Sequence, residues 1–135
     1  IKKYDVVYSL GADCGCAGNL SRFGIRITSG PFDWLYQATF EQRFDCLMNN
    51  FENFLNYNDL KLIPKNPNAK LKDNLHNYYL NTRTGFQFLH DFPIGNITES
   101  QFLAVKEKYD RRIKRFLNNI YGNNKVLLVW FSLNQ

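Results

Sequence analysis

The chain has 135 residues, of which 44% are hydrophobic and 16% aromatic, and its net charge is +5. This composition excludes an intrinsically disordered chain, and no apolar stretch approaches the roughly 20 residues that a membrane-spanning helix needs. The positive charges are scattered apart from one cluster at residues 106–115. No aromatic-plus-basic recognition motif accompanies that cluster, which disfavours a nucleic-acid partner. We expect one domain over residues 1–135 and no membrane partner.

The three cysteines indicate a reducing compartment. Their number is odd, and Cys14 and Cys16 lie only two positions apart, which argues against a disulfide framework. The first residues enter an apolar run at once, so no secretory signal is visible. We therefore expect the protein to be cytoplasmic.

The N-terminal part predicts a strand, a tight turn and a helix. Residues 4–10 form an apolar run typical of a buried strand, which ends at a glycine. Asp13 is placed to cap a helix over residues 14–23, and Gly24 follows where a helix-ending glycine belongs. The β-branched residues 25–29 predict a second short strand. The helix residues expected to face the core are Ala17, Leu20 and Phe23.

A second helix is predicted to begin after Thr39, because Thr39 and Gln42 form a capping box, and to run to about residue 55. Cys46 lies off the apolar stripe of this helix and is expected to be inert. Residues 56–74 are rich in asparagine and are expected to form an irregular loop of the kind that can act as a lid. The apolar stripe consists of Phe40, Phe44, Leu47, Met48, Phe51 and Leu55.

The C-terminal half predicts a hairpin, a long helix and a strand. Residues 76–80 and 86–92 flank a glycine-closed loop, and a capping box at Thr98 and Gln101 begins a helix that runs to Tyr121. Residues 125–133 form a nearly continuous apolar run, which is typical of a central parallel strand. We expect an α/β fold: a layered sandwich with a mainly parallel sheet plus a β-hairpin, truncated from a longer α/β domain.

Cys14 is the candidate nucleophile. A thiol at the start of a helix lies among backbone N–H groups that stabilise its negative form, and the thiolate is the reactive species. The alternative is a buried structural cysteine. Cys16 points elsewhere around the helix and is expected to be a packing residue.

A nucleophilic thiol needs a base, and the chain has two histidines. We favour His90, although it shares its predicted strand face with three phenylalanines and a core histidine is the alternative; His76 is discounted. Asp91 follows His90 but points to the opposite face of the strand. The third member of the site is therefore expected to be Asp33, with Asp13 or a residue beyond position 135 left open.

Other chemistries fit the pattern less well. Zinc binding by Cys14, Cys16, His76 and His90 is disfavoured, because Cys-x-Cys is not the usual spacing of structural zinc sites. No phosphate-cradling motif is present, and we expect neither a metal nor a cofactor. Most of the basic cluster is expected to be a solvated helix face, although Arg111 and Arg112 have the chemistry to bind an acidic group. The cluster consists of Lys106, Lys108, Arg111, Arg112, Lys114 and Arg115.

Three blocks of the N-terminal part form a distinctive pattern. They are Ser9-Leu10-Gly11 with Cys14, Ala17 and Leu20, then Phe23-Gly24 with Arg26, then Ser29-Gly30-Pro31-Phe32-Asp33-Trp34. Together with weaker blocks at residues 88–92 and 108–116, they resemble a family of uncharacterised bacterial proteins described as putative papain-like cysteine peptidases. The resemblance implies a cysteine nucleophile at Cys14, a histidine at His90 and an acidic partner.

The first block also resembles that of SGNH-type hydrolases, which place a nucleophile after the first strand of a flavodoxin-like sheet. The strand-first layout fits that scaffold better than papain's. We therefore expect a cysteine-dependent hydrolase or acyltransferase acting on an unidentified peptide, ester or amide. The alternatives are a non-catalytic binding module of a surface or polysaccharide-related system and, weakest, an anionic-polymer binder.

Overall fold

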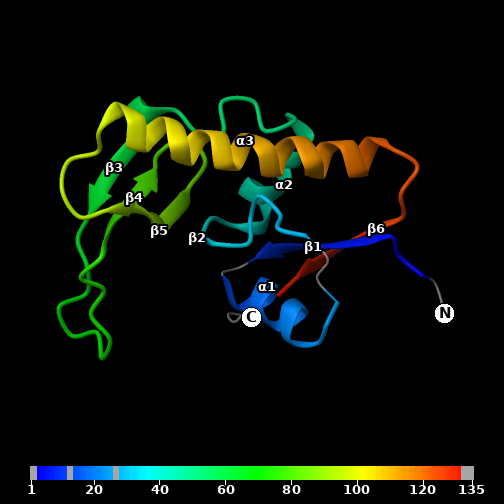
Figure 1. Ribbon diagram of the computed structural model, residues 1–135, viewed down its shortest axis with the longest axis horizontal. Coiled ribbons are helices and arrows are strands. Elements are labelled where there is room, and N and C mark those ends of the chain that lie inside the picture. The colour runs from blue at the N-terminus through cyan, green and yellow to red at the C-terminus, as the bar shows by residue number, and fades with distance from the viewer. Residues whose placement is uncertain (1–2, 12–13, 26–27, 132–135) are drawn as a thin grey trace.

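The computed structural model describes residues 3–11, 14–25 and 28–131, and its strands form two separate sheets (Figure 1). The first sheet pairs β1 (Val6–Gly11) with β6 (Val126–Trp130) in parallel. The second is antiparallel and has the order β2-β5-β4-β3. Its strands are β2 (Leu35–Gln37), β3 (Leu60–Ile63), β4 (His76–Asn81) and β5 (Phe86–Pro93).

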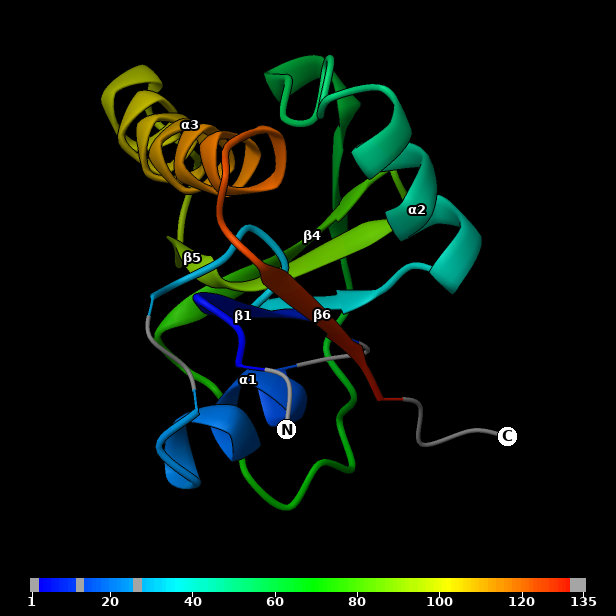
Figure 2. The ribbon, with the colours of Figure 1, turned by 90° about the vertical axis from the view of Figure 1, so that its right-hand side faces the viewer.

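The helices lie on both sides of these strands. The long helix α3 (Glu99–Tyr121) runs along one side of the molecule, and α1 (Cys14–Arg22) lies on the opposite side of β1 and β6 (Figures 1 and 2). Helix α2 (Phe40–Met48) and the short helix η1 (Tyr57–Asp59) precede β3. The capping boxes predicted at Thr39 and Thr98 are both present.

The α/β class is confirmed, but the prediction of a mainly parallel sheet is wrong. Among the described residues only β1 and β6 are parallel, and the larger sheet is antiparallel. The flavodoxin-like sheet is therefore not formed by this part of the chain. The predicted hairpin is present as β4 and β5. The layered sandwich and the single domain stay predictions.

Strand β6 pairs with β1 as a parallel strand, but it is not central in the part of the chain that the structure describes. Val6 pairs with Val126 and Tyr8 with Leu128. All five residues of β6 are partly exposed, whereas all six of β1 are buried. A strand bonded along one edge leaves its other edge uncovered, which accounts for the difference from the expected two-sided burial.

Aromatic side chains form the core between α3 and the antiparallel sheet. Tyr109 of α3 packs against Phe88 and Phe54 at ring-centroid distances of 5.4 and 5.9 Å. Such large rings contribute much of the buried apolar area of a small domain. The most completely buried apolar rings are Phe32, Phe86, Phe88, Phe92 and Phe116.

Helix α2 buries a different face from the predicted one. Phe40, Phe44 and Met48 are exposed, whereas Arg43 and Cys46 are buried. The helix also ends at Met48 instead of continuing to residue 55. Asn50 and Phe51 have φ values of 56° and 60°, in the left-handed region that terminates helices.

The remaining corrections concern short elements. The predicted loop at 56–74 contains η1 and β3, and β3 pairs with β4. The described residues of the predicted strand 25–29 are not in a strand, and positions 26 and 27 lie outside the described residues. In α1, Ala17 is buried as predicted, but Phe23 is exposed just beyond the helix. Gly24 has a φ of 69°, which suits its predicted place after the helix.

Candidate active site

Cys14 is the first residue of α1 and is partly buried. Its sulfur lies 2.7 Å from the hydroxyl oxygen of Tyr36 in β2. The first N–H groups of a helix lack intrahelical partners, and the helix dipole is positive at that end. The strand-turn-helix prediction for this segment is therefore correct in its β1 and α1 portions, while Asp13, predicted to cap the helix, lies outside the described residues.

Tyr36 links Cys14 to His90. Its hydroxyl oxygen lies 3.2 Å from Nε2 of His90 in β5, the strand that pairs with β2. A phenol both donates and accepts, so it can hydrogen-bond the sulfur and the imidazole at the same time. The structure thus brings together two of the predicted site residues through a third that sequence analysis missed. No local signal marked Tyr36, because its contacts with Cys14 and His90 span 22 and 54 positions of the chain.

An irregularity in β5 turns His90 out of the core. Tyr79 pairs with Phe88 and Asn77 with Phe92, so two steps along β4 correspond to four along β5. Such an irregularity, in which one strand has extra residues, changes the direction of nearby side chains and is common beside active sites. Phe88 and Phe92 stay buried while His90 is exposed, so the core-histidine alternative is wrong.

Two rings flank His90. Trp34 approaches it edge-on with a centroid distance of 5.8 Å, and His76 with one of 6.2 Å. His76 itself is held by Asp73, whose carboxylate lies 3.0 Å from Nδ1. The Leu75 amide and, to a smaller extent, His76 lower the pKa of Asp73. His76 therefore lies in the outer part of the site, with Asp73 as its partner.

Asp33 is buried, and its carboxylate accepts a hydrogen bond of 2.9 Å from the amide of Gly30. This bond closes the turn that leads into Trp34 and β2. A contact of Asp33 with the imidazole stays a prediction.

Asp91 is held by α3. Its side chain is 2% exposed, forms an ion pair with Lys108 and accepts a 2.7 Å hydrogen bond from the Tyr109 hydroxyl. Burial, reinforced by the Asp91 charge, raises the pKa of Tyr109, so this phenol stays a donor. Asp91 therefore anchors β5 to α3 immediately beside His90.

Behind the site, Arg43 of α2 joins the two sheets. Its fully buried side chain donates to the carbonyl oxygens of Leu10 in β1 at 2.6 Å and of Gln37 in β2 at 2.5 Å, with a longer bond of 3.3 Å to Ala38. Gln37 and Ala38 have φ values of 56° and 55°, which are uncommon for residues other than glycine. Arg43 thus stabilises the unusual turn that directly follows Tyr36.

Gly11 lets the guanidinium of Arg43 reach the end of β1. It has a φ of 110°, and a Cβ at this position would overlap the guanidinium of Arg43. The glycine that ends the first strand is therefore required by both the backbone conformation and the close approach.

Two further cysteines differ from Cys14 in their surroundings. Cys16 is buried and its sulfur lies 3.7 Å from the carbonyl oxygen of Val129. Burial, with a smaller effect of Asp45, raises the pKa of Cys46 to about 11. Within residues 3–11, 14–25 and 28–131, no group of three or more histidine, cysteine or acidic residues is arranged to hold a metal ion.

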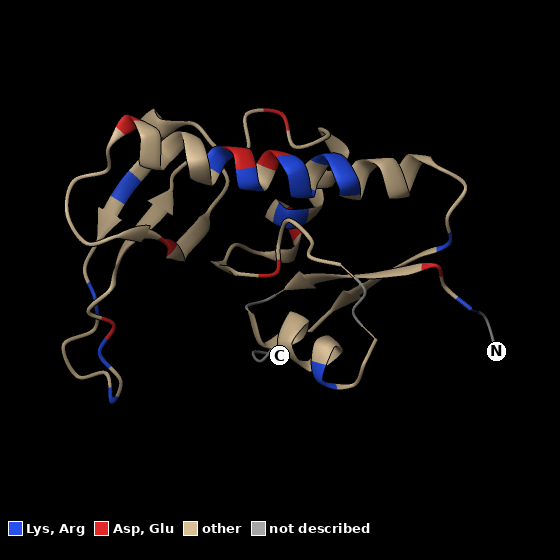
Figure 3. Cartoon of the chain, viewed as in Figure 1, with Lys and Arg blue, Asp and Glu red and all other residues tan. Residues whose placement is uncertain are grey.

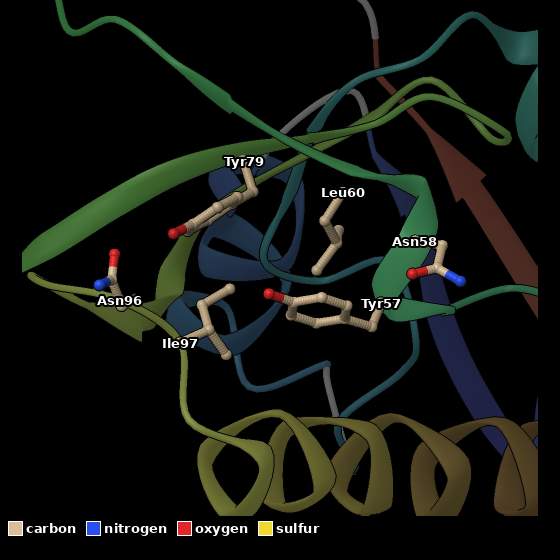
Figure 4. Close-up of a pocket in the computed structure, with 6 residues that line it drawn as sticks. All are labelled: Tyr57, Asn58, Leu60, Tyr79, Asn96 and Ile97. Atoms are coloured by element: carbon tan, nitrogen blue, oxygen red, sulfur yellow. The ribbon is translucent and has the colours of Figure 1, made fainter.

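Two pockets differ in charge. The first, called here the basic cleft, is about 280 Å³ and is lined by Trp34, His90, Asp91, Lys108 and Arg112. The second, called the tyrosine pocket, is about 350 Å³ and its lining is uncharged. Figure 4 shows the hydroxyl ends of its two tyrosines turned toward the side where Asn96 and Ile97 lie. The tyrosine pocket is lined by Tyr57, Asn58, Leu60, Tyr79, Asn96 and Ile97.

The predicted basic cluster is divided among several contacts. Figure 3 shows the basic residues of α3 in its middle turns, with acidic residues among them. Arg111 pairs with Glu107, Lys108 with Asp91, and Arg115 donates to Thr28.

Among the described residues, no helix is long and apolar enough to cross a membrane.

Comparison with known proteins bears out the sequence resemblance. The family model described as "Putative papain-like cysteine peptidase" matches residues 5–134. A relative, "Uncharacterized protein R408" of Acanthamoeba polyphaga mimivirus, is 30% identical over 131 residues, which are 90% of this chain and 59% of the relative. That relative is viral, so it lends no support to the bacterial origin that the sequence resemblance implied. No solved structure matches the chain significantly. The chain belongs to the family described as putative papain-like cysteine peptidases.

Proposed function

We propose that this protein is a cysteine-dependent hydrolase or acyltransferase in which Cys14 attacks the carbonyl carbon of a peptide, ester or amide. The observation that carries the proposal is the hydrogen-bonded chain from the Cys14 sulfur through the Tyr36 hydroxyl to Nε2 of His90. Nucleophilic catalysis by cysteine needs a thiol and a base, and here the Tyr36 hydroxyl connects the two. The cytoplasm suits this chemistry, because it keeps such a thiol reduced.

In the first half-reaction, the Cys14 proton passes to the Tyr36 oxygen while the Tyr36 proton passes to Nε2 of His90. The sulfur then bonds to the carbonyl carbon, and the electron pair of the C=O bond moves to oxygen. In this mechanism, backbone N–H groups in the first turn of α1 stabilise that negative charge. When the intermediate collapses, the bond to the leaving group breaks, and the leaving group takes the proton from His90 through Tyr36.

In the second half-reaction, water or another acceptor attacks the thioester at Cys14. His90 accepts the proton of the attacking group, the C–S bond breaks, and the sulfur recovers a proton through Tyr36. We assign Asp33 to bracing the turn before β2, through its bond to Gly30, instead of requiring it to touch the imidazole. The chain covers 59% of the viral relative, so the substrate of the whole protein is part of this proposal.

The test uses p-nitrophenyl acetate as acyl donor and mass spectrometry to locate the acetyl group. We expect acetylation of Cys14 at neutral pH to be about 10²-fold or more faster than that of N-acetylcysteine, from proton transfer by a positioned base. His90→Gln is expected to remove this advantage. His76→Gln is the matched control, because its imidazole lies beside His90 but is held by Asp73.

Two outcomes contradict the proposal. One is a rate for Cys14 no greater than that of N-acetylcysteine. The other is an equal rate in His90→Gln, confirmed as folded by circular dichroism. The rate of iodoacetamide labelling across pH provides an independent measurement of the same activation.

A non-catalytic binding module is the second candidate, and the tyrosine pocket favours it. Aromatic rings and amide groups without charge suit an uncharged polar ligand such as a saccharide. Binding of neutral oligosaccharides that Tyr57→Ala abolishes, together with an unactivated Cys14, is the result expected from this function.

A further inference from the structure

The basic cleft lies directly beside the proposed site. His90 belongs to both, since its ring lines the cleft while its Nε2 contacts Tyr36. The indole of Trp34 lies against the same imidazole. A molecule held in the cleft is therefore adjacent to the groups that would react.

Two of the charges in the cleft neutralise each other. Asp91 is almost fully buried and pairs with Lys108, while its second oxygen accepts the Tyr109 hydroxyl. This carboxylate is saturated by α3 and presents little negative charge to a ligand. The charge that the cleft offers therefore comes mainly from Arg112.

Arg112 is exceptional among the arginines of α3. Arg111 has an ion pair with Glu107, and Arg115 donates to Thr28. One terminal nitrogen of Arg112, Nη1, is buried with no hydrogen-bond partner, and in the described part of the chain no carboxylate forms an ion pair with this guanidinium. Its guanidinium lies 5.8 Å from the centre of the Tyr109 ring.

A buried donor without a partner is costly, and a guanidinium gains most from a carboxylate or phosphate, which it binds through two parallel hydrogen bonds. An anion in the cleft would supply the counter-charge that this guanidinium lacks, and the guanidinium atoms that line the cleft would donate to it. The volume of about 280 Å³ accommodates a small acidic group with a few further atoms.

We propose that the basic cleft binds an anionic group of the substrate, a carboxylate or a phosphate, through Arg112, and so directs the reacting carbonyl toward Cys14. The substrate class is then an acyl compound or peptide that carries an acidic group near the bond to be broken. This assignment rests on the proposed function, because it names the substrate of that same site.

The experiment compares paired alkylating reagents that differ only in charge. N-iodoacetyl derivatives of glycine, β-alanine and γ-aminobutyric acid each carry a carboxylate, and their carboxamides are the neutral partners. We expect Cys14 of the full chain to react at least about tenfold faster with the best carboxylate than with its amide, as a charge-assisted hydrogen bond allows. The best linker length measures the span between the sulfur and Arg112.

Variants separate the cleft from general electrostatics. Arg112→Gln is expected to bring the ratio of carboxylate to amide rates close to that of N-acetylcysteine. Arg111→Gln, which removes the same charge from an exposed neighbour, is expected to keep the preference. Inorganic phosphate is expected to slow the carboxylate reagents selectively if the cleft accepts either anion; protection by acetate alone identifies a carboxylate site.

Equal rates for carboxylate and amide in the wild-type chain overturn the proposal, and so does a preference that survives Arg112→Gln. If iodoacetamide shows Cys14 to be unactivated, the proposed function fails, and the cleft is then judged by binding. In that case, proton NMR of the His90 ring, assigned with His76→Gln, is followed during titration with inorganic phosphate and acetate. A saturable shift that Arg112→Gln removes supports the anion site, and its absence overturns it.

Discussion

The two sheets are assembled in different ways. The parallel pair joins the ends of the described chain, where Lys125 and Asp5 are bonded across 120 positions, and β6 stays partly exposed. The antiparallel sheet closes locally through the hairpin of β4 and β5 and packs fully buried phenylalanines against α3. Cys14 follows the first sheet, whereas Tyr36 and His90 belong to the second. The candidate site therefore exists only when the two units are correctly packed together.

Arg43→Met is expected to break this connection with the largest effect. Each buried carbonyl left without a donor costs about 1–3 kcal/mol, so we expect a loss of about 2–4 kcal/mol in urea unfolding. Hydrogen exchange should rise more in β1 and β6 than in β4 and β5. Arg111→Met, at an exposed ion pair, should cost about 0.5 kcal/mol or less. Uniform exchange across both sheets would contradict the comparison.

Gly11→Ala tests the same junction from β1. An alanine there has an unfavourable φ and a Cβ that displaces Arg43, so we expect a destabilisation of about 2 kcal/mol. Gly18→Ala, in α1, is the matched control, because a Cβ added there would have no neighbouring atom within 4 Å. That change should stabilise the protein by about 0.5–1 kcal/mol in thermal unfolding. A neutral Gly11→Ala would show that the close approach is unnecessary.

Tyr36→Phe removes one hydroxyl between the two sheets. We expect a modest loss of stability of about 1 kcal/mol, but a fall of about 10²-fold in Cys14 acetylation, because the sulfur loses its connection to His90. Tyr57→Phe, in the tyrosine pocket, should change neither. An acetylation rate unchanged in Tyr36→Phe would mean that His90 reaches the sulfur without the phenol.

The ionisation of Cys46 gives the smallest expected effect at neutral pH, because it acts only under alkaline conditions. Its pKa is raised in the fold to about 11, so the buried neutral thiol contributes stability below pH 9 that is lost as pH rises toward 11. Cys46→Ala should flatten this part of the stability curve, measured by urea unfolding at several pH values. An identical slope in both proteins would show that Cys46 ionises equally easily in the folded and unfolded chains.

Sequence patterns predicted the elements that depend on local signals. Helix α3 and the hairpin of β4 and β5 both carry caps or clear periodicity. Strands β2 and β3 were missed because three or four residues carry little periodicity, and their pairing depends on distant residues. The face of α2 was wrong because Arg43 satisfies carbonyls from two strands, which a hydrophobic pattern does not reveal.

The candidate site could likewise be predicted only where local sequence signals mark its residues. Cys14 was indicated by the local strand-turn-helix pattern, and His90 by being one of only two histidines. The exposure of His90 depends on the irregular pairing of β5, which strict alternation along a strand does not anticipate. Tyr36 acquires its position only through tertiary contacts.

The Arg43 contacts also affect how activity can be lost. Arg43 is not one of the three groups proposed to react, yet the carbonyls that it binds belong to Leu10, near the end of β1, and to Gln37, directly after Tyr36. A related protein could keep the cysteine, the tyrosine and the histidine and still lose their relative positions through a substitution at position 43. Its reactive residues would be complete, yet it would be inactive. Arg43 is therefore the first position to check before the proposed activity is assigned to a related protein.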